Sequence, residues 1–181
     1  MSLNITKVNT IPDLYILTPR IFSDPRGYFL ETFKEKELKE AGIIQNFVQD
    51  NFSLSSKGTL RGTHFQREPM AQGKLVSVVH GAVWDVAVDL RKDSATFGRW
   101  YGIELNDENH ITLYLPPGFG HAFIALKNNT KFTYKCTNYY SPEHESGVRW
   151  DDPDIDIKWP IENPLISGKD ADLPLLKDLS I

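Results

Sequence analysis

The sequence lacks cysteine pairs and long apolar runs. Cys136 is the single cysteine among 181 residues, so the chain can form neither an internal disulfide nor a zinc cluster of several thiolates. No apolar run approaches the ~18 residues that a membrane span needs, and the N-terminus lacks a charged stretch followed by an apolar one. These absences predict a cytoplasmic protein.

Excess charge of one sign is also missing. The 20 Lys and Arg and the 24 Asp and Glu give a net charge of −4. This balance argues against nucleic-acid or membrane-surface partners, although a local cluster of cations can still hold an anionic small molecule. Hydrophobic residues make up 40% of the chain and aromatic residues 12%, enough for a real core. We expect a single domain over residues 1–181.

Helix signals are scarce, and strand signals are numerous. The one convincing helix is 34–41, which is charged and stops at Gly42. Short β-type segments punctuated by Gly or Pro predict an all-β sandwich or barrel. From about residue 142 onward Pro and Asp become frequent, which indicates a tail that wraps over the barrel. The expected strands are 14–17, 28–33, 47–53, 59–66, 74–80, 82–90, 99–105, 111–115, 120–127 and 131–138.

The stretch 59–66 concentrates chemically useful side chains. Arg61 and His64 are three positions apart, so they would face opposite sides of a regular strand. A kink at Gly62 would let both look into one cavity, since glycine inside a strand often marks a bulge.

Lys74 opens the next apolar run, 74–80, after the loop 67–73. We expect these two segments to be neighbouring strands, with His64 and Lys74 facing each other across a pocket.

The segment 116–121 has the spacing Pro-x-Gly-x-x-His, which ends at His121. It resembles the second motif of the cupin double-stranded β-helix, a jelly-roll barrel. Metal-binding cupins carry a His-x-His pair and then a Glu after the glycine of their first motif. Here only His64 follows Gly62, whereas a transition metal usually needs three protein ligands. We therefore expect no metal, which leaves His64 free to act as an acid or base near neutral pH.

A metal-free barrel with a histidine and a lysine suggests proton abstraction beside a carbonyl. Lys74 is suited to stabilising the enolate oxygen that develops. Epimerisation also needs a group on the opposite face that returns the proton, and Tyr134 lies on the strand after His121. Asp170 offers a carboxylate that can orient His64.

Seven motifs in order give the sequence a specific likeness. They are Asp-Pro-Arg-Gly at 24–27, Val-Gln-Asp-Asn at 48–51, Leu-Arg-Gly-Thr-His-Phe-Gln at 60–66, Gln-Gly-Lys at 72–74, Asp-Val-Ala-Val-Asp-Leu-Arg at 85–91, Gly-Phe-Gly-His at 118–121 and Asn-Tyr-Tyr at 138–140. Over about residues 10–175 the chain resembles the dTDP-4-dehydrorhamnose 3,5-epimerase family. It departs from the family at Thr63-His64-Phe65, where Leu-His-Tyr is usual, and at Gly120 and Ala122.

The resemblance implies a cupin homodimer that needs no cofactor. Its substrate would be a dTDP-4-keto-6-deoxyhexose, inverted at carbons 3 and 5, which flank the ketone at carbon 4. The product would enter dTDP-L-rhamnose-type biosynthesis for lipopolysaccharide or cell-wall polysaccharide. By motif position, His64 is the base, Asp170 its partner, Lys74 the group that polarises the ketone, and Tyr134 the acid on the other face.

The resemblance also implies a substrate-binding set. Arg26 and Arg61 would hold the diphosphate, a task suited to guanidinium forks. Some contacts are expected from the partner subunit's N-terminal strands. The other residues implied to bind substrate are Glu31, Gln49, Asp50, Asn51, His121, Tyr140, Glu145 and Lys169.

Four alternatives stay open at this point. The enzyme could invert only carbon 5 or only carbon 3, or it could be a ketoisomerase that moves the carbonyl of the same nucleotide sugar. A cupin that binds the sugar nucleotide without catalysis, and a metal dioxygenase, are the other two.

His121 and Tyr134 could instead be packing residues of the barrel. Asp85 and Asp89 alternate with valines and are expected to be fold residues.

Overall fold

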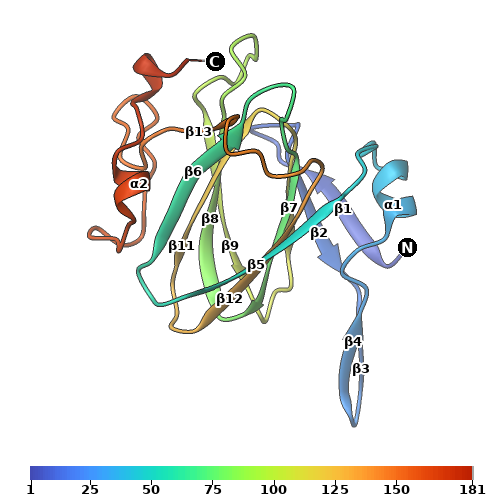
Figure 1. The fold of residues 1–181 in the computed structure, drawn as a ribbon. Helices are drawn as coiled ribbons and strands as arrows, with labels where there is room; N and C mark the ends of the chain where they lie inside the picture. Colours follow the sequence, from blue (N-terminus) through green and yellow to red (C-terminus); the bar gives the residue numbers. More distant parts are fainter. Residues whose placement is uncertain (181) are drawn as a thin grey trace.

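Two antiparallel sheets face each other and form a jelly-roll barrel (Figure 1). The computed structural model describes residues 1–180. The first sheet has the order β1-β2-β10-β7-β12-β5 and the second the order β13-β6-β11-β8-β9. Every pair of neighbouring strands in them is antiparallel. The predicted all-β cupin-type class is therefore confirmed.

Each predicted segment overlaps a strand, whereas the strands at 3–7, 21–24 and 145–147 were not predicted. The first sheet consists of β1 (Leu3–Lys7), β2 (Tyr15–Pro19), β5 (Gln49–Ser55), β7 (Lys74–His80), β10 (Thr112–Leu115) and β12 (Thr130–Cys136). The second consists of β6 (Leu60–Gln66), β8 (Ala82–Asp89), β9 (Trp100–Asn106), β11 (Phe119–Ala125) and β13 (Glu145–Gly147). The other elements are β3 (Ile21–Asp24), β4 (Gly27–Leu30), α1 (Glu35–Glu40), α2 (Gly168–Ala171) and the 3-10 turn η1 (Leu176–Asp178).

The predicted pairing of β6 with β7 is wrong. β6 pairs with β11 and β13, whereas β7 pairs with β10 and β12, so the loop 67–73 crosses from one sheet to the other. Strands that follow each other in a jelly roll commonly belong to different sheets, which adjacency in sequence does not reveal. The two strands nevertheless face each other, because they line opposite walls of the barrel.

The main core fills the space between the sheets. Phe132 on β12 packs with Phe123 on β11, with ring centroids 4.3 Å apart, and both side chains are buried. Large apolar side chains from both sheets thus close the deep part of the barrel. The core also contains Val76, Val78, Val83, Ala87, Leu105, Leu113, Leu115 and Phe119.

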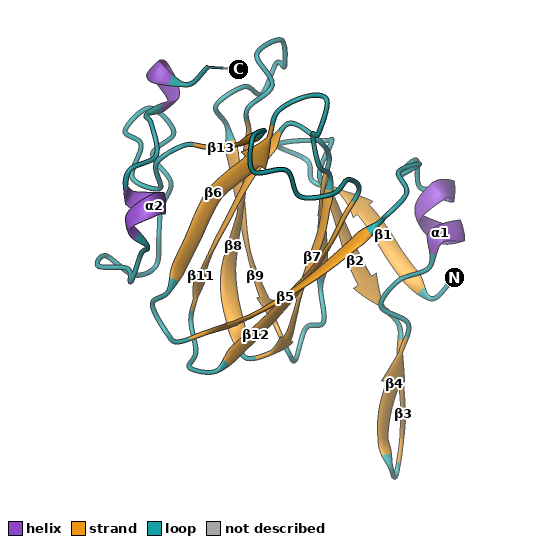
Figure 2. Cartoon of the chain, viewed as in Figure 1, coloured by secondary structure: helices purple, strands orange, loops and turns teal. Residues whose placement is uncertain are grey.

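Each sheet is covered over part of its outer face (Figure 2), although Phe52 and Leu54 on the outer side of β5 stay exposed. The C-terminal segment packs Ile155, Ile157 and Leu179 against Val86 and Val88 of β8, which is therefore buried on both faces. Burial on both faces explains why β8 reads as a nearly continuous apolar run. α1 covers the other sheet through Leu38.

The hairpin β3–β4 projects away from the barrel (Figure 1). Its apolar side chains are exposed, including Phe22 and Phe29, and its turn carries Arg26. The Tyr28 ring contacts the ring of His110, with centroids 5.1 Å apart. All four residues of β3 are exposed, so no core-facing alternation marked this strand in the sequence.

No helix among residues 1–180 has the length and apolar character needed to cross a membrane.

Candidate active site

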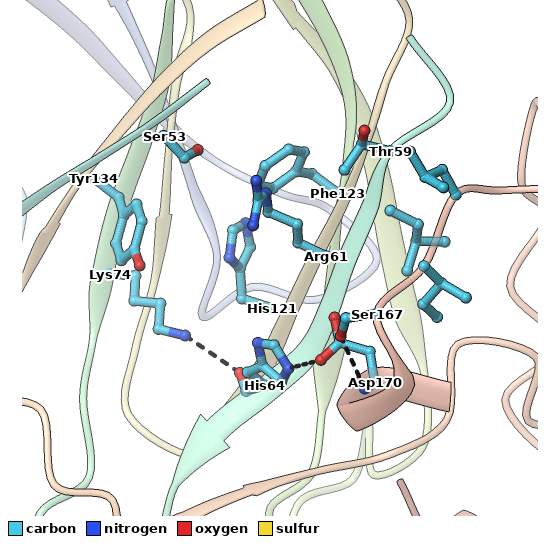
Figure 3. A pocket seen from close by; sticks show the side chains of 13 residues that line it. Ser53, Thr59, Arg61, His64, Lys74, His121, Phe123, Tyr134, Ser167 and Asp170 are labelled. Carbon is cyan, nitrogen blue, oxygen red and sulfur yellow. Dashed lines mark hydrogen bonds and ion pairs between the residues drawn. The ribbon is translucent and has the colours of Figure 1, made fainter. Parts of the chain in front are cut away.

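A cavity of about 510 Å³ opens between the two sheets (Figure 3). β6 and β11 contribute one wall, β12 and β7 contribute the opposite wall, and the C-terminal segment before and in α2 closes one side. The cavity contains the four predicted catalytic residues. It is lined by Ser53, Thr59, Leu60, Arg61, His64, Lys74, His121, Phe123, Tyr134, Leu165, Ile166, Ser167 and Asp170.

His64 and Asp170 form a hydrogen-bonded pair, as the sequence predicted. Nε2 of His64 lies 2.7 Å from Oδ1 of Asp170, whose other oxygen accepts from the backbone N–H of Gly62 at 3.2 Å. Asp170 is 5% exposed. Burial alone would raise the pKa of Asp170, but the hydrogen bond to His64, with that from Gly62, holds it below its ordinary value. An ionised carboxylate therefore orients the imidazole ring.

Gly62 provides the predicted kink in β6. Its φ of +113° lies in a region that glycine adopts readily, and the register of β6 against β11 shifts between the pairs His121–His64 and Phe123–Arg61. Because the strand is irregular there, Arg61 and His64 both line the cavity. A Cβ at position 62 would collide with the carbonyl oxygen of His121.

Lys74 faces His64 from the opposite wall. Its Nζ donates to the backbone carbonyl of His64 at 3.3 Å, and the residue is 8% exposed. Burial lowers the pKa of Lys74 below its ordinary value. The Lys74 ammonium has a single hydrogen-bond acceptor among residues 1–180. It can therefore stabilise an anionic oxygen placed beside it.

Tyr134 comes from the same wall as Lys74, across the cavity from His64 (Figure 3). Burial raises the pKa of Tyr134 above its ordinary value, so the phenol keeps its proton at neutral pH. The imidazole of His64 and the protonated phenol of Tyr134 thus lie on opposite walls of one cavity.

His121 has a buried partner that the sequence did not identify. Nε2 of His121 lies 2.8 Å from Oδ2 of Asp85, and the His121 ring stacks on Phe132 at a centroid distance of 5.8 Å. His121 is also the cross-strand partner of His64. Asp85 is a fold residue of β8, as expected, but it also fixes the orientation of a ring that lines the cavity.

A second cavity, of about 360 Å³, adjoins the first and shares His64, Lys74 and Tyr134 with it. Four predicted substrate-binding residues line it, namely Gln49, Asn51, Tyr140 and Glu145. Gln49 and Asn51 are half-buried while Asp50 between them is exposed, so the face of β5 that carries Gln49 and Asn51 turns toward this cavity. Lys169 reaches this group through Glu145, with 2.6 Å between Nζ and Oε2.

Four predicted substrate-binding residues line neither cavity, namely Arg26, Glu31, Asp50 and Lys169. Asp50 points to the outer face of the sheet and pairs with Lys135 at 2.9 Å. Arg26 sits in the turn of the β3–β4 hairpin with its side chain 89% exposed, bound only to Asp24 among residues 1–180. Glu31 follows the hairpin and pairs with Lys34.

Several residues that line the first cavity were not predicted from the sequence. Phe123, Leu165 and Ile166 line the first cavity with apolar side chains that carry no chemical signature, and Ser53 gives a small polar one. Only the alternation of β5, which puts Ser53 on the face of Gln49 and Asn51, contained a usable signal. Among residues 1–180, no group of three or more His, Cys, Asp or Glu side chains is arranged to hold a metal ion.

Comparison with known proteins agrees with this geometry. The family model described as dTDP-4-dehydrorhamnose 3,5-epimerase matches residues 8–178. The enzyme of that name from Shigella flexneri is 51% identical over 169 residues, 93% of each chain.

Solved structures agree as well. The Legionella pneumophila dTDP-6-deoxy-D-glucose-3,5-epimerase in complex with dTDP-4-keto-L-rhamnose is 47% identical, with a TM-score of 0.94 over 98% of this chain and 95% of that one. A 3′-monoepimerase from Streptomyces bikiniensis in complex with dTDP-quinovose is 36% identical, with a TM-score of 0.88 over 95% of this chain and 87% of that one.

Fold and site together define a cupin-type epimerase of nucleotide sugars. The family match and the identities narrow this class further. The chain belongs to the dTDP-4-dehydrorhamnose 3,5-epimerase family. The predicted family and enzyme activity are thereby confirmed.

The close approach of β6 to β11 predicts the effect of Gly62→Ala. The new methyl group would overlap the His121 carbonyl and lie 2.7 Å from Cα of Ala122, and alanine disfavours the positive φ. We expect the free energy of unfolding to fall by about 1–3 kcal/mol, with His64 displaced and activity reduced. Urea unfolding and initial rates measure the two effects. Gly168→Ala is the control, because a Cβ added at position 168 would meet no atom within 4 Å. Equal stability of both variants would contradict the packing argument.

Proposed function

We propose that the chain inverts carbon 5 and then carbon 3 of a dTDP-4-keto-6-deoxyhexose through enolate intermediates, with the predicted catalytic residues in the roles given below. The observation that carries the proposal is the placement of a histidine–carboxylate pair and a protonated tyrosine on opposite walls of one cavity, with a buried ammonium beside them. Inversion requires removal of a proton from one face of a carbon and its return to the other face.

His64 is the base. Since the Asp170 carboxylate accepts from Nε2–H, the other ring nitrogen carries the lone pair and can take a proton from carbon. Asp170 then stabilises the imidazolium that forms. Both carbons flank the ketone at carbon 4, so one base can serve them in turn after the ring shifts within the cavity.

Lys74 stabilises the enolate. It has one hydrogen-bond acceptor among residues 1–180, the His64 carbonyl, which leaves two of its three N–H donors for the ketone oxygen. A donor already fixed where negative charge develops lowers the barrier without reorganisation during the reaction.

Tyr134 returns the proton from the opposite wall, a role that the raised pKa of its phenol supports because the group stays protonated. Arg61 and His121, which line the same cavity, hold the diphosphate. Gln49, Asn51, Tyr140 and Glu145 complete the site for the sugar and nucleotide from the second cavity.

We infer that the working unit is a homodimer in which the partner completes each site. The β3–β4 hairpin exposes apolar side chains and carries Arg26 away from its own barrel, as expected of a segment that contacts another surface. Arg26 and Glu31 would then serve the partner's site. The buried, unpaired Cys136 fits a cytoplasmic enzyme, and a role in lipopolysaccharide or cell-wall polysaccharide synthesis fits the family.

Single-site epimerisation is the second candidate. It is favoured by the fold shared with the Streptomyces bikiniensis 3′-monoepimerase, which shows that this barrel also hosts a one-centre reaction. Incubation with dTDP-4-keto-6-deoxyglucose in D₂O separates the two, because deuterium enters both carbons of the product in the first case and one in the second.

His64→Ala removes the base and leaves the nucleotide-binding surface in place. We expect kcat to fall about 10²- to 10⁴-fold, the range typical of general base catalysis, with dTDP binding retained. Calorimetry with dTDP and the rate of solvent deuterium incorporation at carbons 3 and 5 measure the two properties. An undiminished exchange rate would remove His64 from the mechanism.

The lowered pKa of Lys74 predicts that activity falls at alkaline pH. Its ammonium form is the active one and its pKa is lowered, so activity should be lost as pH rises through a value below 10.5. Tyr134 has a raised pKa and should keep its proton through this range. In Lys74→Arg the charge persists, so we expect a lower kcat without that alkaline loss. The same alkaline loss in the arginine variant would assign it to another group.

The dimer is tested by mixing two inactive variants, Arg26→Ala and His64→Ala. If Arg26 serves the partner's site, a mixed dimer has one site with both residues intact. Random exchange of subunits should then restore about a quarter of the wild-type activity, because half of the dimers are mixed and each has one working site. If Arg26 acted within its own chain, mixing would restore nothing.

A further inference from the structure

Asp85 is a fully buried carboxylate inside the barrel. It is 0% exposed, its Oδ2 lies 2.8 Å from Nε2 of His121, and its Oδ1 has no hydrogen-bond partner among residues 1–180. An ionised carboxylate that is out of water is costly unless a cation or several donors compensate it. The protonation of the His121 ring therefore decides whether this buried pair carries a net charge.

The two side chains meet because β8 and β11 are neighbours. Asp85 is the cross-strand partner of Phe123, two positions from His121, so both side chains point into the barrel from the same face of the sheet. The His121 ring packs against Phe132 and lines the cavity of the site (Figure 3). Because Asp85 holds Nε2, Nδ1 is the ring nitrogen left for a ligand.

The number of protons on the pair decides what Nδ1 can bind. When a neutral ring donates from Nε2–H to an ionised Asp85, Nδ1 carries a lone pair, which repels a phosphate oxygen. One more proton, on either the ring or the carboxylate, turns Nδ1 into an N–H donor that can bind an anionic oxygen. A diphosphate held by His121 therefore requires that extra proton.

The cations of the cavity oppose the extra proton while no anion is bound. Arg61 and Lys74 line the cavity together with His121, and burial lowers the pKa of Lys74 against the attraction of Asp85. Two cations near the pair disfavour a third positive charge. The ionisable groups that line the cavity around the pair are Arg61 and His64 on β6, Lys74 on β7, Tyr134 on β12 and Asp170 on α2.

We propose that the pair of Asp85 and His121 takes up one proton when the diphosphate of the substrate binds, so that His121 donates from Nδ1 to a phosphate oxygen while Asp85 holds Nε2. The anion offsets the charges of Arg61 and Lys74 and so removes the obstacle to a further proton. This proton uptake rests on the proposed function, because it requires the diphosphate to lie against His121. By linkage, the affinity for the ligand should fall about tenfold per pH unit wherever the bound pair holds the proton and the empty pair does not.

Calorimetric titration with dTDP-quinovose, the ligand of the Streptomyces bikiniensis structure, measures both effects. This sugar nucleotide has no ketone and both of its phosphates are esterified, so it neither reacts nor gains a proton near neutral pH. Titrations in buffers of different ionisation enthalpy, between about pH 6 and 8.5, give the number of protons taken up and the affinity. We expect uptake of about one proton and an affinity that falls with pH. Asp85→Asn keeps the shape of the side chain but has no charge to hold the proton, so both effects should vanish.

Two control variants change other ionisable groups of the cavity. Lys74→Arg keeps a permanent cation on β7, and His64→Ala removes the ring that pairs with Asp170. Proton uptake should persist in both, since Asp85 and His121 are unchanged. Imidazole NMR of the wild-type enzyme reports the ring without any variant. At the pH where uptake is measured, Nδ1 of His121 should be unprotonated in the free enzyme and protonated in the complex.

Four results would overturn the proposal: no proton uptake in the wild type, uptake that persists in Asp85→Asn, uptake that is lost in Lys74→Arg, or the same protonation of Nδ1 with and without ligand. If Asp85→Asn does not fold, the NMR comparison still decides. A fully active His64→Ala would remove the proposed base and leave the proton uptake intact. An inactive His64→Ala without uptake in the wild type would reject the uptake alone. The effect lies in affinity and KM, apart from the alkaline loss of kcat predicted for Lys74.

Discussion

The close contact between β6 and β11 at Gly62 is the constraint on which the site depends. The glycine lets the two backbones approach each other and interrupts the regular alternation of side chains along β6. As a result, Arg61 and His64 both point into one cavity. The same residue donates its N–H to Asp170. One backbone position therefore fixes both the direction of the His64 side chain and the place of its carboxylate partner, which is why a side chain there would disturb geometry and stability together.

Burial shifts the pKa values of two of the proposed catalytic groups in opposite directions. Removing Lys74 and Tyr134 from water disfavours the charged form of each, which lowers the pKa of the lysine and raises that of the tyrosine. An anionic oxygen placed beside the buried Lys74 ammonium stabilises its charged form. The Tyr134 phenol keeps its proton and can donate it. One physical cause, desolvation between two sheets, thus prepares Lys74 and Tyr134 on the same wall for the electrophile and acid roles that we propose.

Much of this could be predicted from residues alone, and the failures have a common reason. The glycine within a strand predicted the kink at Gly62, because such a kink depends on local geometry. The partners of β6 and the pairing of His121 with Asp85 join residues far apart in sequence, and local patterns did not reveal them. The pair of His64 and Asp170 is farther apart still, and it was predicted because the family resemblance assigned both residues. Apolar lining residues such as Phe123 and Leu165 look like any core residue until the barrel is assembled.

The same distinction explains why the site belongs to the whole chain and not to one motif. His64 lies on one sheet, Lys74 and Tyr134 on the other, and Asp170 comes from a helix more than a hundred positions after the histidine. None of these contacts exists until both sheets have closed on the main core and the C-terminal segment has packed on β8. A change far from the cavity, in the packing of that segment on β8, should therefore reach the site through the position of the Asp170 carboxylate and of the lining residues Leu165, Ile166 and Ser167, which the same segment carries.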